Sequence, residues 1–139
     1  MRSQYSDKSQ IYYDAAVELM DGKGNFSPIP HITYYCCMLR MFHIWYVEKQ
    51  KSEIDLQRTE DGSYTKEVHN QLANNFKNFV AEKYKRIDIT MASDFAKKLG
   101  ALKKLRVKAD YKKESISYQD SRKAIELCDS ILKILKSLI

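Results

Sequence analysis

The chain has 139 residues, a length that suits one domain. A chain of this length can bury enough surface to fold without disulfides or metal. Only four glycines and two prolines interrupt it, and this composition favours long helices over short strands. The net charge of +6 suits an anionic partner, although such an excess is more often a property of a solvated surface. We therefore predict a single domain over residues 1–139.

The cysteines indicate a reducing compartment. Cys36, Cys37 and Cys128 form no CxxC pair, and the adjacent Cys36 and Cys37 cannot close an unstrained disulfide with each other. We therefore predict a cytoplasmic location.

Two segments bear on membranes. Residues 1–10 are polar and lack the apolar core of a secretory signal. The most apolar stretch, 32–47, is shorter than an ordinary membrane-spanning helix and carries Arg40 and His43 near its middle. The sequence therefore predicts a core helix and no membrane association.

The first half of the chain predicts two helices. Over 6–21, apolar residues recur at helical spacing, and those expected to face inward are Tyr12, Ala15, Ala16, Leu19 and Met20. Ser27 followed by Pro28 is typical of a helix start, with a capping residue and then proline at the first helical position. The second helix, 30–48, is apolar on nearly every side, so we expect neighbours to surround it at the centre of a bundle.

The second half predicts three more helices after a polar surface connection over 48–65, which ends in a turn at 60–63. Helical spacing resumes over 65–84, and a basic helix begins near Thr90. This fourth helix is expected to present Phe95, Leu99, Leu102 and Ala109 inward. The last predicted helix begins at Ser117 with a capping-box pattern and continues to Leu138. Together these patterns predict an all-α, up-and-down bundle of about five helices.

Most catalytic and cofactor motifs are missing. His31, His43 and His69 lack metal-ligand spacing, and there is no glycine-rich phosphate loop or nucleophile elbow. We predict no metal and no cofactor. Arg40 and His43 stand one turn apart and could face one phosphate. The alternative, which the pattern favours, is that Arg40 extends to a carboxylate and His43 is a hydrogen-bonded core residue.

A basic stretch over 97–113 is the other candidate binding region. It includes Lys97, Lys104 and Lys108, and Tyr111 lies within reach of a base or ribose. This pattern suits RNA or a nucleotide. Lysines on the outer face of a helix more often only solvate the protein, and that alternative remains open.

Three segments resemble the HEPN domain, in its small stand-alone prokaryotic branch. The first, over 34–43, begins with the pair Tyr34 and Tyr35, and the second leads from His69 into 76–80. The third, 102–111, ends in Asp110 and Tyr111 and is followed by the final helix. The resemblance implies a four-helix bundle with an extra helix, which commonly forms a homodimer and can pair with a small nucleotidyltransferase.

Many HEPN proteins are metal-independent RNases that act as toxins or in host defence. Their motif is an arginine followed, four to six residues later, by a histidine. Guanidinium can hold the scissile phosphate while imidazole transfers the proton of the attacking or leaving oxygen. The corresponding arginine here is Arg106, but Tyr111, Lys112 and Lys113 stand where the histidine is expected.

The first hypothesis is therefore a non-catalytic HEPN-like module that dimerises and binds a nucleotide, RNA or a nucleotidyltransferase-type partner. Its expected binding residues are Arg40, Lys97, Lys104, Lys108 and Asp110. The runner-up is an RNase that uses Arg106 with a relocated base, either Tyr111 or His43. A third hypothesis is a purely structural interaction domain, in which charge reversal of the basic helix changes only solubility.

Overall fold

The computed structural model describes residues 2–22, 25–59 and 61–139, so Met1, Lys23, Gly24 and Glu60 lie outside it. Over the described residues the fold is all-helical and contains no strand, which confirms the predicted fold class. The helices are α1 (Gln4–Asp21), α2 (Ile29–His43), α3 (Glu53–Leu56), α4 (Val68–Tyr84), α5 (Met91–Tyr111) and α6 (Tyr118–Lys136), and α2 continues into a π-helical turn over Ile44–Glu48. In the described part of the chain, no helix has both the length and the apolar character needed to cross a bilayer.

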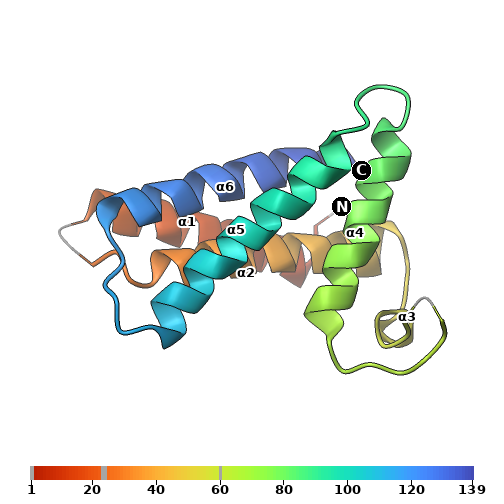
Figure 1. Cartoon of the computed structure of the whole chain (residues 1–139), viewed down its shortest axis with the longest axis horizontal. Helices are drawn as coiled ribbons and strands as arrows, with labels where there is room; N and C mark the ends of the chain where they lie inside the picture. The colour runs from red at the N-terminus through yellow and green to blue at the C-terminus, as the bar shows by residue number, and fades with distance from the viewer. Residues whose placement is uncertain (1, 23–24, 60) are drawn as a thin grey trace.

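Four helices, α1, α2, α5 and α6, extend along the longer dimension of the molecule and alternate in direction (Figure 1). The fifth long helix, α4, stands across one end, beside the short α3 (Figure 1). The start of α1 and the end of α6 lie toward this same end (Figure 1). The arrangement agrees with the predicted up-and-down bundle and adds α3 to the five helices expected from the sequence.

The helix α2 is the centre of the core, as its apolar composition predicts. It packs against α1, α5 and α6 and touches α4. Fully buried side chains from α2 and its π-helical extension include Cys36, Cys37, Met41 and Ile44. Because α1, α5 and α6 cover α2 on several sides, side chains from these three helices lie around it.

The buried face of α1 differs from the expected one. Ala16 is buried as expected, but Tyr12, also expected to face inward, is 37% exposed, and Ser6 and Ser9 are buried instead. The hydroxyl of Ser9 donates a hydrogen bond of 2.8 Å to the carbonyl oxygen of Cys36. Small side chains allow α1 to approach α2 closely, and a hydroxyl bonded to the backbone can be buried without leaving a polar group unsatisfied.

The connection between the second and third expected helices is more ordered than its polar sequence suggests. Ser52 caps α3, whose last residue, Leu56, is fully buried. The indole nitrogen of Trp45 donates a hydrogen bond of 2.9 Å to the carbonyl oxygen of Ser52. The following helix, α4, begins at Val68 rather than at the expected Thr65, and Glu60 of the expected turn lies outside the described residues.

Candidate functional site

The side chain of Arg106 on α5 lies among three tyrosine rings. Its guanidinium carbon is 5.6 Å from the ring centre of Tyr34, and 5.5 Å from those of Tyr35 and Tyr111. One guanidinium nitrogen, Nη2, donates a hydrogen bond of 3.2 Å to the hydroxyl of Tyr35. Cation–π attraction and this hydrogen bond hold the charge at a fixed place on the surface of the bundle.

Asp110 links Arg106 to a histidine. Its Oδ2 atom lies 3.3 Å from Nε of Arg106, one turn earlier on α5, and 2.8 Å from Nδ1 of His31 on α2. Nε of Arg106 is buried and makes no hydrogen bond within the described residues, so the contact with Asp110 is an ion pair without hydrogen-bond geometry. The Nε–H donor of the guanidinium is therefore buried without a hydrogen-bond partner among the described residues.

Two histidine rings lie close to that of Tyr35. The ring centre of Tyr35 is 4.7 Å from that of His31 and 5.9 Å from that of His69 on α4. Burial, followed by the positive charges of Arg106 and Lys103, lowers the pKa of His69 below its ordinary value of 6.5. The surroundings therefore favour the uncharged form of the His69 imidazole. We call the group the Arg106 cluster: Arg106, Asp110, Tyr111, Tyr34, Tyr35, His31 and His69.

The structure brings together three of the sequence-predicted site residues, Arg106, Asp110 and Tyr111. It places His43 elsewhere, eight residues or about 12 Å along the helical path from Tyr35. His43 is buried, with Nδ1 at 2.7 Å from the Ser3 hydroxyl and Nε2 at 3.2 Å from a Glu48 carboxylate oxygen. This placement corresponds to the alternative in which His43 is a hydrogen-bonded core residue.

Arg40 also lies outside the Arg106 cluster. It lines a hollow of about 290 Å³ with residues of α1 and α6, including Tyr13 and Asp129. A hydrogen bond with Asp129 raises the pKa of Tyr13 to about 12, with burial as the next cause. Arg40 and His43, one turn apart in sequence, therefore face different surroundings, and the structure does not bring them to one ligand.

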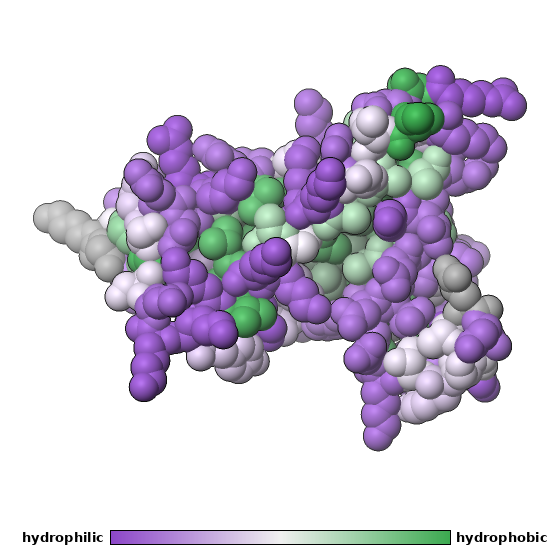
Figure 2. Space-filling model, in the orientation of Figure 1, coloured by the Kyte–Doolittle hydropathy of each residue, from purple (hydrophilic) through white to green (hydrophobic). Residues whose placement is uncertain are grey.

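The predicted lysines divide into two groups. Lys104 and Lys108 line an open hollow of about 590 Å³ on α5, together with Gly100, Lys103, Val107, Lys112 and Glu114. Lys97 is exposed but does not line it. The ammonium of Lys108 lies 3.0 Å from Asp120, whose pKa its hydrogen bond lowers. Figure 2 shows hydrophilic side chains spread over this view of the molecule, with smaller hydrophobic areas between them.

A narrow groove of about 170 Å³ between α4 and α5 adjoins both regions. Tyr34 and His69 of the Arg106 cluster line it, and so do Gly100 and Lys103 of the lysine hollow. Across it, the ammonium of Lys103 donates a hydrogen bond of 3.2 Å to the side-chain oxygen of Asn70. The Arg106 cluster, the groove and the lysine hollow thus form one continuous surface.

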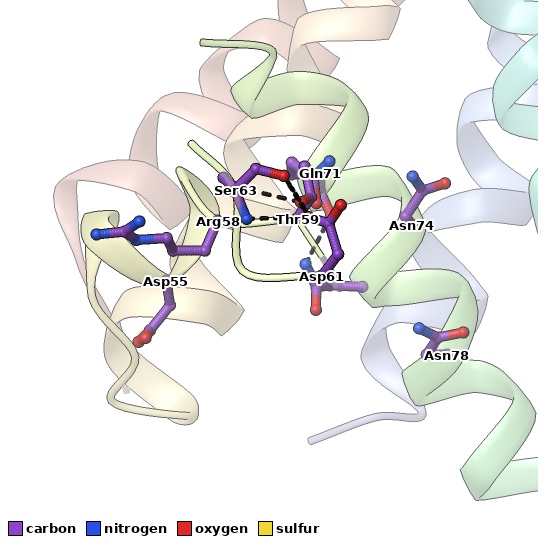
Figure 3. A pocket seen from close by; sticks show the side chains of 9 residues that line it. Asp55, Arg58, Thr59, Asp61, Ser63, Gln71, Asn74 and Asn78 are labelled. Atoms are coloured by element: carbon purple, nitrogen blue, oxygen red, sulfur yellow. Dashed lines mark hydrogen bonds between the residues drawn. The ribbon is translucent and has the colours of Figure 1, made fainter. Parts of the chain in front are cut away.

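A larger cleft of about 610 Å³ lies between α4 and the loop after α3 (Figure 3). On the loop side, Asp61 accepts hydrogen bonds from the hydroxyls of Thr59 and Ser63. Asn74 and Asn78 project from α4 one turn apart (Figure 3). We call it the amide cleft, because Gln71, Asn74, Asn75 and Asn78 all line it.

Sequence reasoning missed His31, His69 and the amide cleft as parts of a site. For the cleft a signal existed, because amide residues recur over 71–78 at the spacing of one helical face. The two histidines gave no such signal, since His31 lies 79 residues from its partner Asp110. No group of three or more metal-ligating side chains gathers in the part of the chain that the structure describes.

No protein-family model matches the sequence, and the searches of curated proteins and of solved structures likewise found no match. The resemblance to the HEPN domain therefore stays a prediction from the sequence.

Proposed function

We propose that this chain is a HEPN-like helical module that binds RNA or a nucleotide, with a phosphate group at the Arg106 cluster. The observation that carries the proposal is the position of Arg106, which is 17% exposed and aligned by Tyr35 and Asp110. An arginine held in this way presents a planar set of donors, and such a set favours phosphate.

The neighbours of Arg106 support a nucleic-acid ligand over a simple anion. Tyr111 is 69% exposed and lies against the guanidinium, so its free ring face can stack on a base. The lysine hollow adjoins the cluster through the groove and offers Lys103, Lys104 and Lys112 to further phosphates. Single-stranded RNA fits best, because its unpaired bases are available for stacking.

The proposal is tested by fluorescence anisotropy with a labelled single-stranded oligoribonucleotide at low salt. Arg106→Ala should weaken binding by about tenfold to a hundredfold, the loss expected when a charged hydrogen-bond partner is removed. Lys123→Ala removes an exposed positive charge from α6 and serves as the matched control. Equal weakening by both variants, or no binding by the wild type, would contradict the proposal.

The resemblance also implies a homodimer and a nucleotidyltransferase-type protein partner, and we carry both forward as proposals. Light scattering of the purified chain distinguishes a dimer from a monomer. Co-purification with a small nucleotidyltransferase encoded beside it tests the second. If both tests fail while RNA still binds, only the assembly part of the proposal is withdrawn.

A second candidate function is a metal-independent RNase that acts as a toxin or defence component. The observation that favours it is the His69 imidazole beside Arg106, whose surroundings favour the uncharged form, because a neutral imidazole can accept a proton from a 2′-hydroxyl. His31 and Tyr111 are further titratable groups at the cluster. Here His69 takes the role that the sequence suggested for His43.

The RNase candidate predicts cleavage of single-stranded RNA in the presence of a metal chelator. His69→Gln should abolish cleavage while binding is retained, whereas Arg106→Ala should reduce both. Intact RNA after prolonged incubation with the wild-type protein would rule this activity out and leave the binding function as the account of the site.

A further inference from the structure

We propose that the amide cleft is a second subsite, which reads the base edges of the same RNA strand whose phosphate lies at the Arg106 cluster. This inference rests on the proposed function and adds a source of sequence preference to it. The ligand class is a single-stranded oligonucleotide with an adenine placed in the cleft.

The amides of the cleft have unused hydrogen-bonding capacity. Within the described residues, the side-chain amides of Gln71, Asn74 and Asn78 make no hydrogen bond, although all three line the cleft. Asn75 differs, because its side-chain nitrogen already donates a bond of 2.8 Å to the carbonyl oxygen of Gln71. An amide offers a donor beside an acceptor, and this pair matches the edge of adenine in two parallel hydrogen bonds.

The charges of the cleft favour a base over a phosphate. Hydrogen bonds from Ser63 and then Thr59 lower the pKa of Asp61 to about 2, so this carboxylate is ionised at neutral pH. Hydrogen bonds from Ser52 likewise lower the pKa of Asp55, which also lines the cleft. Arg58 also lines the cleft, and its Nη1 atom donates a hydrogen bond of 3.1 Å to the carbonyl oxygen of Gly62. The two carboxylates outnumber this cation among the described lining residues, so the cleft repels a phosphate, whereas the lysine hollow attracts it. We therefore expect the phosphates of the RNA strand to lie along α5 and its bases to lie in the cleft.

The cleft and the Arg106 cluster are linked along α4. Asn74 lines both the amide cleft and the groove, and His69 lines the groove and belongs to the Arg106 cluster. From His69 to Asn78 the helix advances by about 14 Å and makes about 2.5 turns, so these two residues lie on opposite sides of α4 and the strand has to pass around the helix at Asn74. This distance exceeds what one nucleotide can span while its phosphate stays at Arg106. The cleft should thus contribute to the binding of oligonucleotides and not of mononucleotides.

The test compares the affinities of a nine-nucleotide oligoadenylate, an oligouridylate of equal length and AMP. The wild type should prefer oligoadenylate by about tenfold, which is the discrimination that one bidentate amide–base pair provides. The double variant Asn74→Ala/Asn78→Ala should lose this preference while its affinities for oligouridylate and AMP stay unchanged. Alanine favours a helix, so α4 should stay folded, and circular dichroism checks this.

Gln119→Ala, which removes an exposed amide from α6, is the matched control and should keep the preference. If the wild type binds both oligonucleotides equally, or if the double variant keeps the preference, the cleft is not a base-reading subsite, and the Arg106 proposal stands unaffected. If neither oligonucleotide binds the wild type, both proposals fail together.

Discussion

At the scale of single residues, the Arg106 cluster holds the guanidinium of Arg106 in a fixed position among other titratable side chains. Asp110 lies between Arg106 and His31, and the three rings around the guanidinium limit its movement. His69 is the member whose charge the surroundings influence most clearly. Burial and the positive charges of Arg106 and Lys103 all disfavour the charged imidazolium form of His69. The pKa of His69 therefore reports whether these groups lie close to its ring.

We predict that the His69 ring titrates with a midpoint below 6.5 in the folded protein. Nuclear magnetic resonance of the ring protons over a pH series measures this midpoint. Arg106→Ala removes a nearby positive charge, so it should raise the midpoint toward the ordinary value. A midpoint at or above 6.5 in the wild type would show that the ring is not beside the guanidinium.

The same shift makes stability depend on pH. The folded state binds fewer protons than the unfolded chain when a histidine pKa is depressed, so the stabilisation is complete above 6.5 and is lost as the pH falls through the lowered folded pKa. Between about pH 7.5 and pH 5, the wild type should lose more unfolding free energy than His69→Gln does. Urea denaturation at both pH values gives the comparison, and equal losses in both proteins would contradict the predicted shift.

At the scale of elements, hydrophobic spacing predicted the long helices well where one face was continuously apolar. The final helix, α6, begins after the predicted cap Ser117. The inward face of α1 was misassigned because two of its buried residues, Ser6 and Ser9, are polar and are hydrogen-bonded. The helix α3 was missed because four residues are too few to show a helical period.

The role of α3 can be tested with two neighbouring apolar residues. Leu56 is fully buried whereas Ile54 is 65% exposed, although both belong to this short helix. Leu56→Ala should lower the unfolding free energy by about 2–5 kcal/mol, the usual cost of a core truncation. Ile54→Ala should change it by less than about 0.5 kcal/mol. Similar effects of both changes in chemical denaturation would mean that α3 does not anchor the loop.

At the scale of the whole molecule, the candidate site is assembled from three helices that are distant in sequence. The residues that α5 contributes, namely Arg106, Asp110 and Tyr111, were expected from the resemblance of the segment 102–111 to the HEPN domain. The sequence could not predict that α2 and α4 supply His31 and His69, since side chains from separate helices meet only through the packing of the bundle. Two histidines that are far from Arg106 in the sequence thus lie near it in space.

The three histidines provide the most direct test of the central claim, that RNA binds through a phosphate at the Arg106 cluster. Two of them, His31 and His69, belong to the cluster, whereas His43 is buried elsewhere and serves as an internal reference. Titration of the protein with a single-stranded oligoribonucleotide, in the presence of a metal chelator, should shift the ring resonances of His31 and His69 and leave those of His43 unchanged. Saturable binding that leaves both cluster histidines unmoved would contradict the account.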